Sequence, residues 1–182
     1  MVSGAEEIFD VVDDQDRVIG QRPRSEVHRL GLLHRSVHVL VFNAAGLMFL
    51  QKRSMHKDEN PGVWDASISG HLDTGESYDQ CAIRESREEL GIILDVAPQP
   101  MFKLEADTST GHEFSWVYRT ESEGPFALQA EEIDGGDWFE LDYLRRWCAD
   151  RPDELAPPLR LIVDTLCTEF SDSTARAGDN DE

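Results

Sequence analysis

The residues of this sequence that combine reactive chemistry with a defined spacing are three glutamates, Glu85, Glu88 and Glu89. On an α-helix, positions i, i+3 and i+4 share one face, so the three carboxylates would point the same way. Like charges at this spacing repel, at a cost of roughly a few tenths of a kcal/mol per pair. Three hard oxygen donors on one rigid face suit Mg²⁺ or Mn²⁺, with water and substrate phosphate completing the coordination.

The same glutamates could instead form an ordinary solvated helix face. Arg84 lies four residues before Glu88, a spacing at which the two side chains pair and relieve the repulsion. On the helix alone, the solvated face and the metal site are equally good interpretations. The wider spacing of the surrounding residues separates them.

The segment that contains the glutamates reads G-x5-E-x7-R-E-x-x-E-E-x-G, followed by an apolar residue. This pattern resembles the signature of the Nudix hydrolase family. The matching positions are Gly70, Glu76, Arg84, Glu85, Glu88, Glu89, Gly91 and Ile92. One position departs, because the family prefers an aliphatic residue where this sequence has Ser86. That departure affects local packing more than chemistry.

The resemblance implies an α+β fold, an α/β/α sandwich with a mixed sheet between helices, in which the motif forms a loop, a helix and a second loop. It also implies a hydrolase in which water attacks phosphorus in a diphosphate (phosphoanhydride) linkage, typically within a nucleoside diphosphate joined to another group. By position, it implies that Glu88 and Glu89 bind metal, with the Gly70 carbonyl as a further ligand. Glu85 would bind metal or deprotonate the water, while Arg84 orients Glu85 and Glu76 braces the motif.

The segment around the glutamates has a clear helix pattern. Ser77 followed three residues later by Gln80 forms a capping box, and the pattern continues until Gly91 ends it. The opposite face carries positions that we expect to pack against a sheet, namely Tyr78, Cys81, Ala82 and Leu90. Cys81 is therefore interpreted as a small buried hydrophobe and not as a nucleophile.

The rest of the chain alternates strand and helix signals, with strands dominant. Two hairpins are predicted, from residues 7–12 with 17–21 and from residues 35–42 with 47–52. Further strands are predicted at 63–69, 113–121 and 137–140, and helices at 141–148 and from Pro157-Pro158 onward. The last helix has an apolar stripe formed by Leu159, Ile162, Leu166 and Phe170.

The segments that flank the motif resemble one branch of the same superfamily, the type I isopentenyl-diphosphate isomerases, from about Glu7 to Trp138. The likeness includes residues 53–57, 61–64 and 69–71. It implies that Arg53 and Lys57 bind diphosphate. It also implies a candidate second metal site formed by His28, His34, His71 and Glu113. For this site to form, the short segment between His28 and His34 would have to turn at Gly31.

The catalytic groups of the isomerase are missing. Its proton-transferring cysteine would stand at Ser69, whose hydroxyl titrates far too high for that task. A second carboxylate of its metal site would fall at Gly111, and its C-terminal tryptophan motif has no counterpart. Hydrolysis is therefore favoured. The alternatives are an isopentenyl-diphosphate isomerase-like enzyme and a non-catalytic Nudix module that binds a nucleotide.

Substrate recognition is less clearly encoded. The cationic cluster of Lys52, Arg53 and Lys57 suits a diphosphate in an otherwise acidic chain, although strand-end solubility explains it too. Three aromatic residues could stack on a base, although their alternating strand positions favour the core: Trp64, Phe114 and Trp116.

A later acidic loop offers an alternative to Glu85. Glu131 and Glu132 precede Gly135-Gly136, and the resemblance implies that such a loop can supply an extra metal ligand or another base. A solvated loop is the simpler interpretation of two adjacent acids.

The composition limits the partners. The 182 residues carry 17 Lys+Arg against 37 Asp+Glu, a formal charge of −20, which argues against general nucleic-acid binding. The longest apolar stretch, residues 37–42, is far too short to cross a membrane. Three scattered cysteines and no secretory leader predict a cytoplasmic protein. The expected partner is a small-molecule diphosphate.

Length and composition predict one domain over residues 1–170, followed by a polar, acidic, disordered tail at 171–182. Nothing in the sequence sets the oligomeric state.

Overall fold

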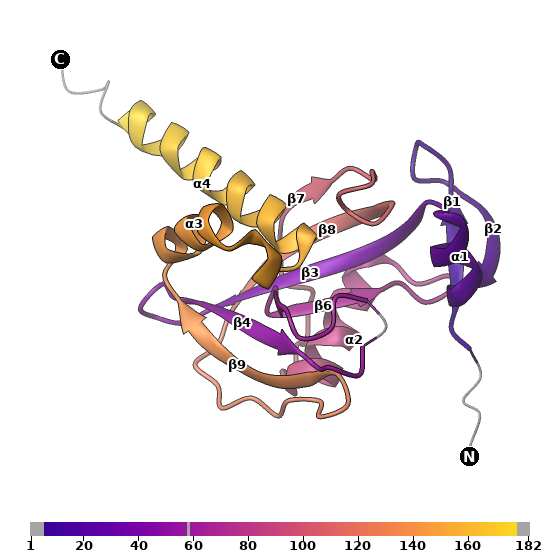
Figure 1. The fold of residues 1–182 in the computed structure, drawn as a ribbon, viewed down its shortest axis with the longest axis horizontal. Coiled ribbons are helices and arrows are strands. Elements are labelled where there is room, and N and C mark those ends of the chain that lie inside the picture. Colours follow the sequence, from indigo (N-terminus) through magenta and orange to yellow (C-terminus); the bar gives the residue numbers. More distant parts are fainter. Residues whose placement is uncertain (1–5, 58, 178–182) are drawn as a thin grey trace.

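The computed structural model describes residues 6–57 and 59–177 and has a mixed α+β architecture (Figure 1). The strands are β1 (Ile8–Val12), β2 (Val18–Pro23), β3 (His34–Phe42), β4 (Met48–Arg53), β5 (Trp64–Asp65), β6 (Ile68–His71), β7 (Gln99–Leu104), β8 (Glu113–Glu121) and β9 (Ile133–Phe139). The helices are α1 (Arg24–Leu30), α2 (Tyr78–Leu90), α3 (Leu141–Asp150), a 3-10 turn η1 (Pro152–Glu154) and α4 (Pro157–Ala177).

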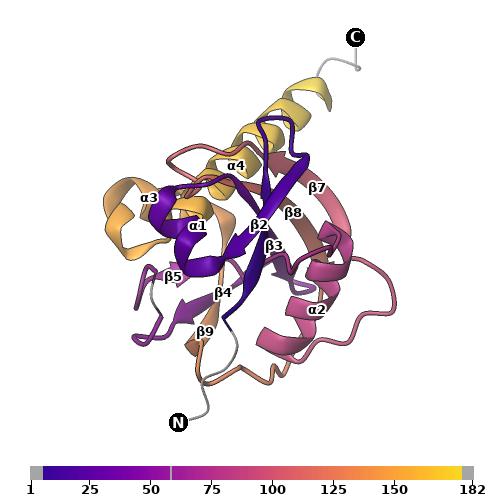
Figure 2. The same cartoon turned by 90° about the vertical axis from the view of Figure 1, so that its right-hand side faces the viewer.

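A mixed seven-stranded sheet separates two apolar layers. Figure 2 shows α2 on one side of this sheet and α3 and α4 on the other. Alternate residues of a strand point to opposite faces, so Val37, Val39 and Val41 of β3 pack with α2, while Leu40 and Phe42 pack with α3 and α4. Helices therefore cover both faces of the sheet. The fold class predicted from the sequence is confirmed.

Strand β3 is the centre of the sheet. One of its edges pairs with a single strand, and the other is shared by two strands. One edge of β3 pairs with β8 in parallel along the whole strand, from His34 to Phe42. On the other edge, β4 pairs with β3 only at Phe42, and β6 pairs with residues 36–39. Because β4 diverges and pairs with β5 and β9, the sheet splits between β4 and β6. This split is where the functional groups described below gather.

Helix α2 begins and ends where the sequence predicts. The Ser77 hydroxyl accepts a hydrogen bond from the Gln80 backbone N–H, and the Gln80 side chain accepts one from the Ser77 backbone, which completes the capping box. Gly91 ends the helix at φ 71°, a left-handed conformation that glycine adopts without a Cβ clash. Cys81, Ala82 and Leu90 are buried against the sheet, as predicted.

The β1–β2 hairpin and α1 form a small unit at one end of the sheet (Figure 2). This unit holds the loop before α2, since the Thr74 hydroxyl donates to the Ile8 carbonyl and the Gly75 N–H donates to Asp10. A second anchor is Asp16, whose carboxylate accepts hydrogen bonds from Tyr78 and Lys103. The N-terminal hairpin thus fixes the approach to the glutamate helix.

Several elements differ from the sequence predictions. The strand predicted at 63–69 is two short strands, β5 and β6, and the strand predicted at 137–140 begins at Ile133 as β9. The sequence does not predict helix α1 or strand β7. Helix α1 has only seven residues and buries one of them, Val27, and β7 has prolines within and next to it, so both give weak periodic signals.

The last helix buries Leu159, Ile162 and Leu166 as its apolar stripe predicts, and the Phe170 side chain lies outside the described residues. Helix α4 continues to Ala177. It therefore extends past residue 170, where the sequence predicts the start of a disordered tail, and residues 178–182 lie outside the described part. Within the described chain, no helix combines the length and the hydropathy that a membrane span requires.

Candidate active site

Arg84 is the centre of a network that joins the loop before α2 to the glutamates on it. Its Nε and one terminal nitrogen donate to the two oxygens of Glu76 at 3.0 and 2.8 Å, a bidentate arrangement. The other terminal nitrogen donates to Glu85 at 2.6 Å and to Glu88 at 3.2 Å. The guanidinium also donates to the His71 carbonyl at 3.0 Å. One cation therefore aligns three carboxylates with the end of β6.

The glutamates of α2 lie in different environments. Glu89 is only 4% exposed, and one of its oxygens accepts hydrogen bonds from the Gln51 side chain and the Ser69 N–H, both at 3.0 Å. Burial raises its pKa well above the usual value. Glu88 has a side chain 47% exposed at the rim of the cavity. The three glutamates that the sequence places on one helix face therefore differ in burial, from the exposed Glu88 to the buried Glu89.

Glu85 lies between these two environments, with a side chain 13% exposed at the cavity wall. Burial raises its pKa to about 7, an effect only partly offset by Arg84, while the nearby carboxylates of Glu88 and Glu132 add to it. A carboxylate that changes protonation near neutral pH can both accept a proton and coordinate a cation.

Glu85 is packed directly against Gly70 of β6. A Cβ atom built on Gly70 would lie 2.1 Å from the Glu85 carboxyl carbon, far inside van der Waals contact. Only glycine leaves room for the carboxyl group at this position. The glycine at this position of the motif therefore allows the β6 backbone to approach the Glu85 carboxyl group closely.

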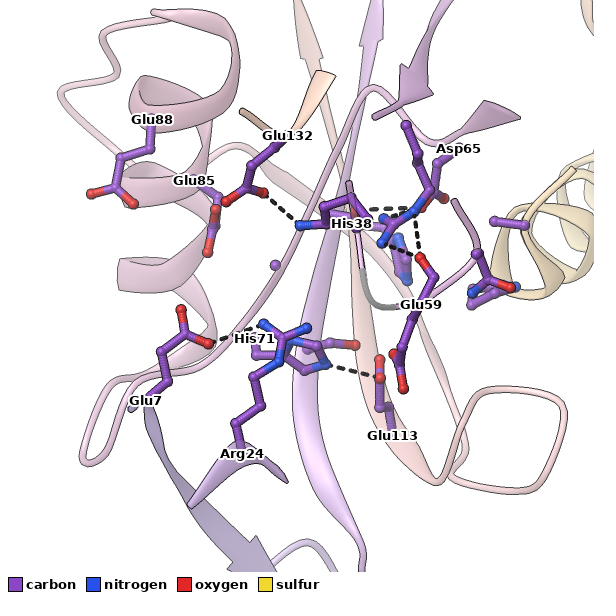
Figure 3. Close-up of a pocket in the computed structure, with 18 of the residues that line it drawn as sticks. Glu7, Arg24, His38, Glu59, Asp65, His71, Glu85, Glu88, Glu113 and Glu132 are labelled. Carbon is purple, nitrogen blue, oxygen red and sulfur yellow. Dashed lines mark hydrogen bonds and ion pairs between the residues drawn. The ribbon is translucent and has the colours of Figure 1, made fainter. Parts of the chain in front are cut away.

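Of the two acids in the later loop, Glu132 reaches the cavity, while Glu131 is exposed. Figure 3 shows Glu132 pointing toward Glu85 from the loop before β9. Its carboxylate accepts a hydrogen bond from Lys57 at 2.7 Å. The sequence singled out this loop, but only the fold distinguishes its two glutamates.

The two cations predicted to bind diphosphate both line the cavity, and both are ion-paired. Arg53 donates to Asp65 at 3.0 Å and to the Glu59 carbonyl, while Lys57 pairs with Glu132. Lys52, the third member of the predicted cluster, lies instead over the Trp64 ring. The cluster is therefore divided between the cavity and the outer part of β4.

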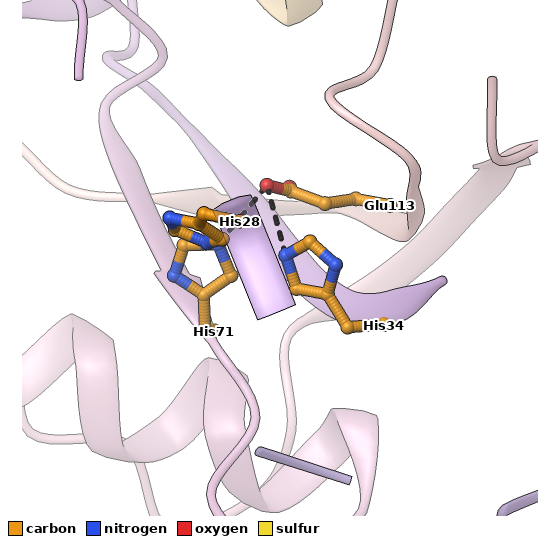
Figure 4. A group of neighbouring side chains, drawn as sticks. All are labelled: His28, His34, His71 and Glu113. Atoms are coloured by element: carbon orange, nitrogen blue, oxygen red, sulfur yellow. Dashed lines mark hydrogen bonds and ion pairs between the residues drawn. The ribbon is translucent and has the colours of Figure 1, made fainter. Parts of the chain in front are cut away.

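A second group of side chains comes together from α1, β3, β6 and β8 (Figure 4). One ligand atom from each of four residues lies within 4.8 Å of the others, and the four residues are His28, His34, His71 and Glu113. Gly31 ends α1 at φ 59° and makes the predicted turn between the first two histidines. Gly111, where the isomerase has a second carboxylate, lies next to Glu113.

The hydrogen bonds described for this histidine cluster leave two of its ring nitrogens, one on His28 and one on His34, without a partner. His34 Nδ1 donates to the Leu32 carbonyl at 2.9 Å. Its Nε2 lies 3.5 Å from the Glu113 carboxylate and is buried without a hydrogen-bond partner. His28 Nε2 is also buried without a hydrogen-bond partner, while its Nδ1 pairs with Glu59 at 3.1 Å. Burial opposes ionisation of Glu113, yet the surrounding His71 and His34 hold its pKa well below the usual value.

Comparison with known proteins identifies the class of protein. The NUDIX domain family matches residues 32–162. An uncharacterized Nudix hydrolase of Streptomyces coelicolor is 37% identical over 134 residues, which cover 73% of this chain and 74% of that protein. An isopentenyl-diphosphate Delta-isomerase of Burkholderia multivorans is 30% identical over 150 residues, which cover 81% and 85% of the two chains. A crystal structure of a Deinococcus radiodurans protein superposes with a TM-score of 0.79 at 27% identity, covering 87% and 98%.

The fold and these matches define a hydrolase that acts on acid anhydrides in phosphorus-containing compounds. The chain belongs to the Nudix hydrolase family. Its similarity to isopentenyl-diphosphate isomerases, which the flanking segments indicate, is confirmed as well.

We expect Gly70→Ala to reduce kcat/KM by about 10²-fold, because the new methyl group displaces the Glu85 carboxyl by an ångström or more. Circular dichroism and steady-state kinetics would measure folding and activity separately. Gly20→Ala is the matched control, since a Cβ at Gly20 meets no atom within 4 Å. Full activity of folded Gly70→Ala would refute this close-packing argument.

The raised pKa of Glu85 predicts a pH-dependent cost to stability in metal-free protein. Because its pKa is about 7 in the folded protein against 4.5 ordinarily, the unfavourable ionisation develops as pH rises from about 5 to 8. Glu85→Gln should therefore raise the free energy of unfolding by about 1–3 kcal/mol at pH 8 and by little at pH 5. Urea denaturation in EDTA at both pH values measures this difference.

The control for that measurement is Glu88→Gln, which changes an exposed carboxylate on the same helix face. We expect its effect on unfolding to be small and similar at the two pH values. A gain for Glu85→Gln that does not grow with pH would contradict the assignment of a raised pKa.

Proposed function

We propose that this chain hydrolyses a diphosphate linkage in a small molecule, in a reaction that depends on Mg²⁺ or Mn²⁺. The observation that carries the proposal is the position of Glu85: buried at the cavity wall, hydrogen-bonded to Arg84 and pressed against the Gly70 backbone. A nucleoside diphosphate joined to another group is the substrate type that this family favours.

The donor set fits such a cation. Glu88, Glu85 and Glu89 offer hard oxygens at increasing depth. By its position in the motif, the carbonyl of Gly70, the residue against which Glu85 packs, is the candidate for a further ligand. Mg²⁺ held there would neutralise phosphate charge and make an attacking water more acidic. Arg84 and Glu76 are positioning residues, since their bidentate pair holds the orientation of Glu85.

Glu85 is our candidate for the group that accepts the proton from the attacking water. A base with a pKa near the working pH combines an ionised form with useful basicity, and the pKa of Glu85 is about 7. Glu132 is the alternative, because its carboxylate also lines the cavity. Glu131 is less suitable because it is exposed and does not reach this wall.

Arg53 and Lys57 are our candidates for binding the diphosphate. Among the described hydrogen bonds, the Lys57 ammonium group donates to one carboxylate, that of Glu132. An ammonium group has three N–H donors, so an entering phosphate could accept a hydrogen bond from one of the others. Arg53 donates to Asp65 and to the Glu59 carbonyl, which fixes its guanidinium at the cavity wall. These contacts support a role in holding the diphosphate in place.

We further propose that the histidine cluster binds a transition metal. Imidazole and carboxylate ligands in a compact group suit Zn²⁺ or Mn²⁺, and a bound cation would give the buried, unpartnered ring nitrogens of His28 and His34 a partner. This feature also favours the second candidate function, an isopentenyl-diphosphate isomerase-like enzyme. Ser69 in place of a proton-transferring cysteine argues against it.

We expect Glu85→Gln to remove most turnover, by about 10²–10⁴-fold in kcat, while leaving folding and Mg²⁺ binding largely intact. The assay is a Mg²⁺-dependent panel of nucleoside di- and triphosphates, sugar nucleotides, dinucleotides, coenzyme A, thiamine diphosphate and isopentenyl diphosphate. Glu132→Gln tests the alternative base in parallel. Full activity of Glu85→Gln would exclude Glu85 as the base.

The panel also separates the candidate functions, because phosphate release and isomer formation are followed together. Release without isomerisation supports the hydrolase, and isomerisation without release supports the isomerase-like enzyme. Tight nucleotide binding without either product would favour a non-catalytic Nudix module.

Protein purified without a His tag should contain Zn or Mn above background by mass spectrometry, and His34→Ala should lose it. His56→Ala is the matched control, because His56 is exposed and lies outside the cluster. Equal metal content in His34→Ala and His56→Ala, or no metal in the wild type, would end this part of the proposal.

A further inference from the structure

His38 is a buried imidazole in the middle of β3 that neither candidate metal site uses. Its side chain is 4% exposed, and both ring nitrogens are buried without a hydrogen-bond partner. A buried polar atom without a hydrogen-bond partner lowers the stability of the fold by about 1–3 kcal/mol. Two such atoms in one ring at the centre of a sheet therefore call for a functional explanation. His38 also lines the cavity, and Figure 3 shows it near the middle of that cavity.

The position of His38 defines a second arm of the cavity. His38 has the same strand parity as Leu40 and Phe42, which pack with α3 and α4, so it faces the side of the sheet opposite α2. The first residues of α4 line the same cavity, through Ala156 just before the helix and Pro158 within it. The cavity therefore continues from the glutamates of α2, through the split in the sheet, to the beginning of α4.

The other polar groups of this arm are already engaged. The Ser36 hydroxyl shares a 2.6 Å hydrogen bond with Ser115, and Asp65 accepts from Arg53. Ser69, directly opposite His38 in the β3–β6 register, uses its backbone N–H to hold Glu89. The His38 ring is thus the group in this arm whose hydrogen-bonding capacity is wholly unused.

The arm is small and offers no aromatic surface to a base. The cavity volume is about 150 Å³, below the roughly 300–1,000 Å³ of pockets that enclose drug-sized ligands. Trp64 packs with the α3–α4 core, Trp116 with the α2 core, and Phe114 is buried. Of the described residues that line the cavity, Phe9 alone is a phenylalanine, tyrosine or tryptophan, and its ring is stacked on His71. The core position that the sequence favours for these aromatic residues agrees with the structure.

We propose that His38 is a specificity-determining residue that hydrogen-bonds a small hydroxylated group attached to the diphosphate of the substrate. This inference rests on the proposed hydrolysis of a diphosphate and names the chemistry of the part that lies beside it. Burial lowers the pKa of His38, so the ring is neutral and presents one N–H donor and one acceptor nitrogen. Hydroxyl groups can both donate and accept, whereas phosphate oxygens only accept and a hydrocarbon chain does neither.

The test compares two diphosphates that differ in the attached group. ADP-ribose carries a hydroxylated sugar, and isopentenyl diphosphate carries a hydrocarbon. Binding is measured by calorimetry with Mg²⁺ in a Glu85→Gln background, where turnover is removed. We expect His38→Leu to weaken the binding of ADP-ribose by about tenfold. The affinity for isopentenyl diphosphate should stay the same or increase. His38→Gln, which keeps a donor and an acceptor, should restore part of the loss.

Leu40→Val is the matched control, since it trims a buried residue on the same strand and face without changing a polar group. Equal weakening of both ligands by His38→Leu, or no weakening of ADP-ribose, would overturn the inference. With Glu85 intact, His38→Leu should raise KM for ADP-ribose with little change in kcat. If the wild type hydrolyses neither compound, the proposed hydrolysis of these substrates fails, while the binding measurement still decides the role of His38.

Discussion

The constraint on which this site depends is the burial of several carboxylates around one guanidinium. Arg84 contacts Glu76, Glu85 and Glu88, and without it these charges would lie together at a poorly hydrated wall. The cation offsets only part of this cost, because burial still raises the pKa of Glu85 to about 7. The folded protein thus retains an unfavourable concentration of negative charge. A divalent cation at this wall would relieve it, so the arrangement is better suited to metal binding than to stability.

The topology of the sheet creates the place where this charge can gather. Strands β4 and β6 share one edge of β3, and the divergence of β4 opens the sheet beside residues 36–39. A closed sheet would pair these backbone edges and fill the space with apolar side chains. In this split, polar residues line both walls: Arg53 comes from β4, His38 from β3 and Ser69 from β6. Helix α2 then needs only to cover one end of the opening.

The sequence predicts what depends on local spacing, and it fails where distant segments meet. Helix α2 with its cap is local, so its bounds and the shared face of its glutamates could be predicted. The order of depth from Glu88 to Glu89 could not, because it depends on Gln51 and on the β6 backbone. Likewise, nothing local distinguishes Glu132 from Glu131. His38 resembles a strand histidine of the core until the split in the sheet is known, and its two unpaired nitrogens are a purely tertiary observation.

Strand β6 shows how closely the glutamate wall and the histidine cluster are coupled. Side chains alternate between faces of a strand, so adjacent residues serve different neighbours. The backbone of Ser69 holds Glu89, Gly70 receives the Glu85 carboxyl, and His71 turns to Glu113 in the histidine cluster. Arg84 also binds the His71 carbonyl, so one guanidinium contacts the glutamate wall and the backbone of the histidine cluster. A shift of β6 by one residue would exchange these faces and dismantle both groups together.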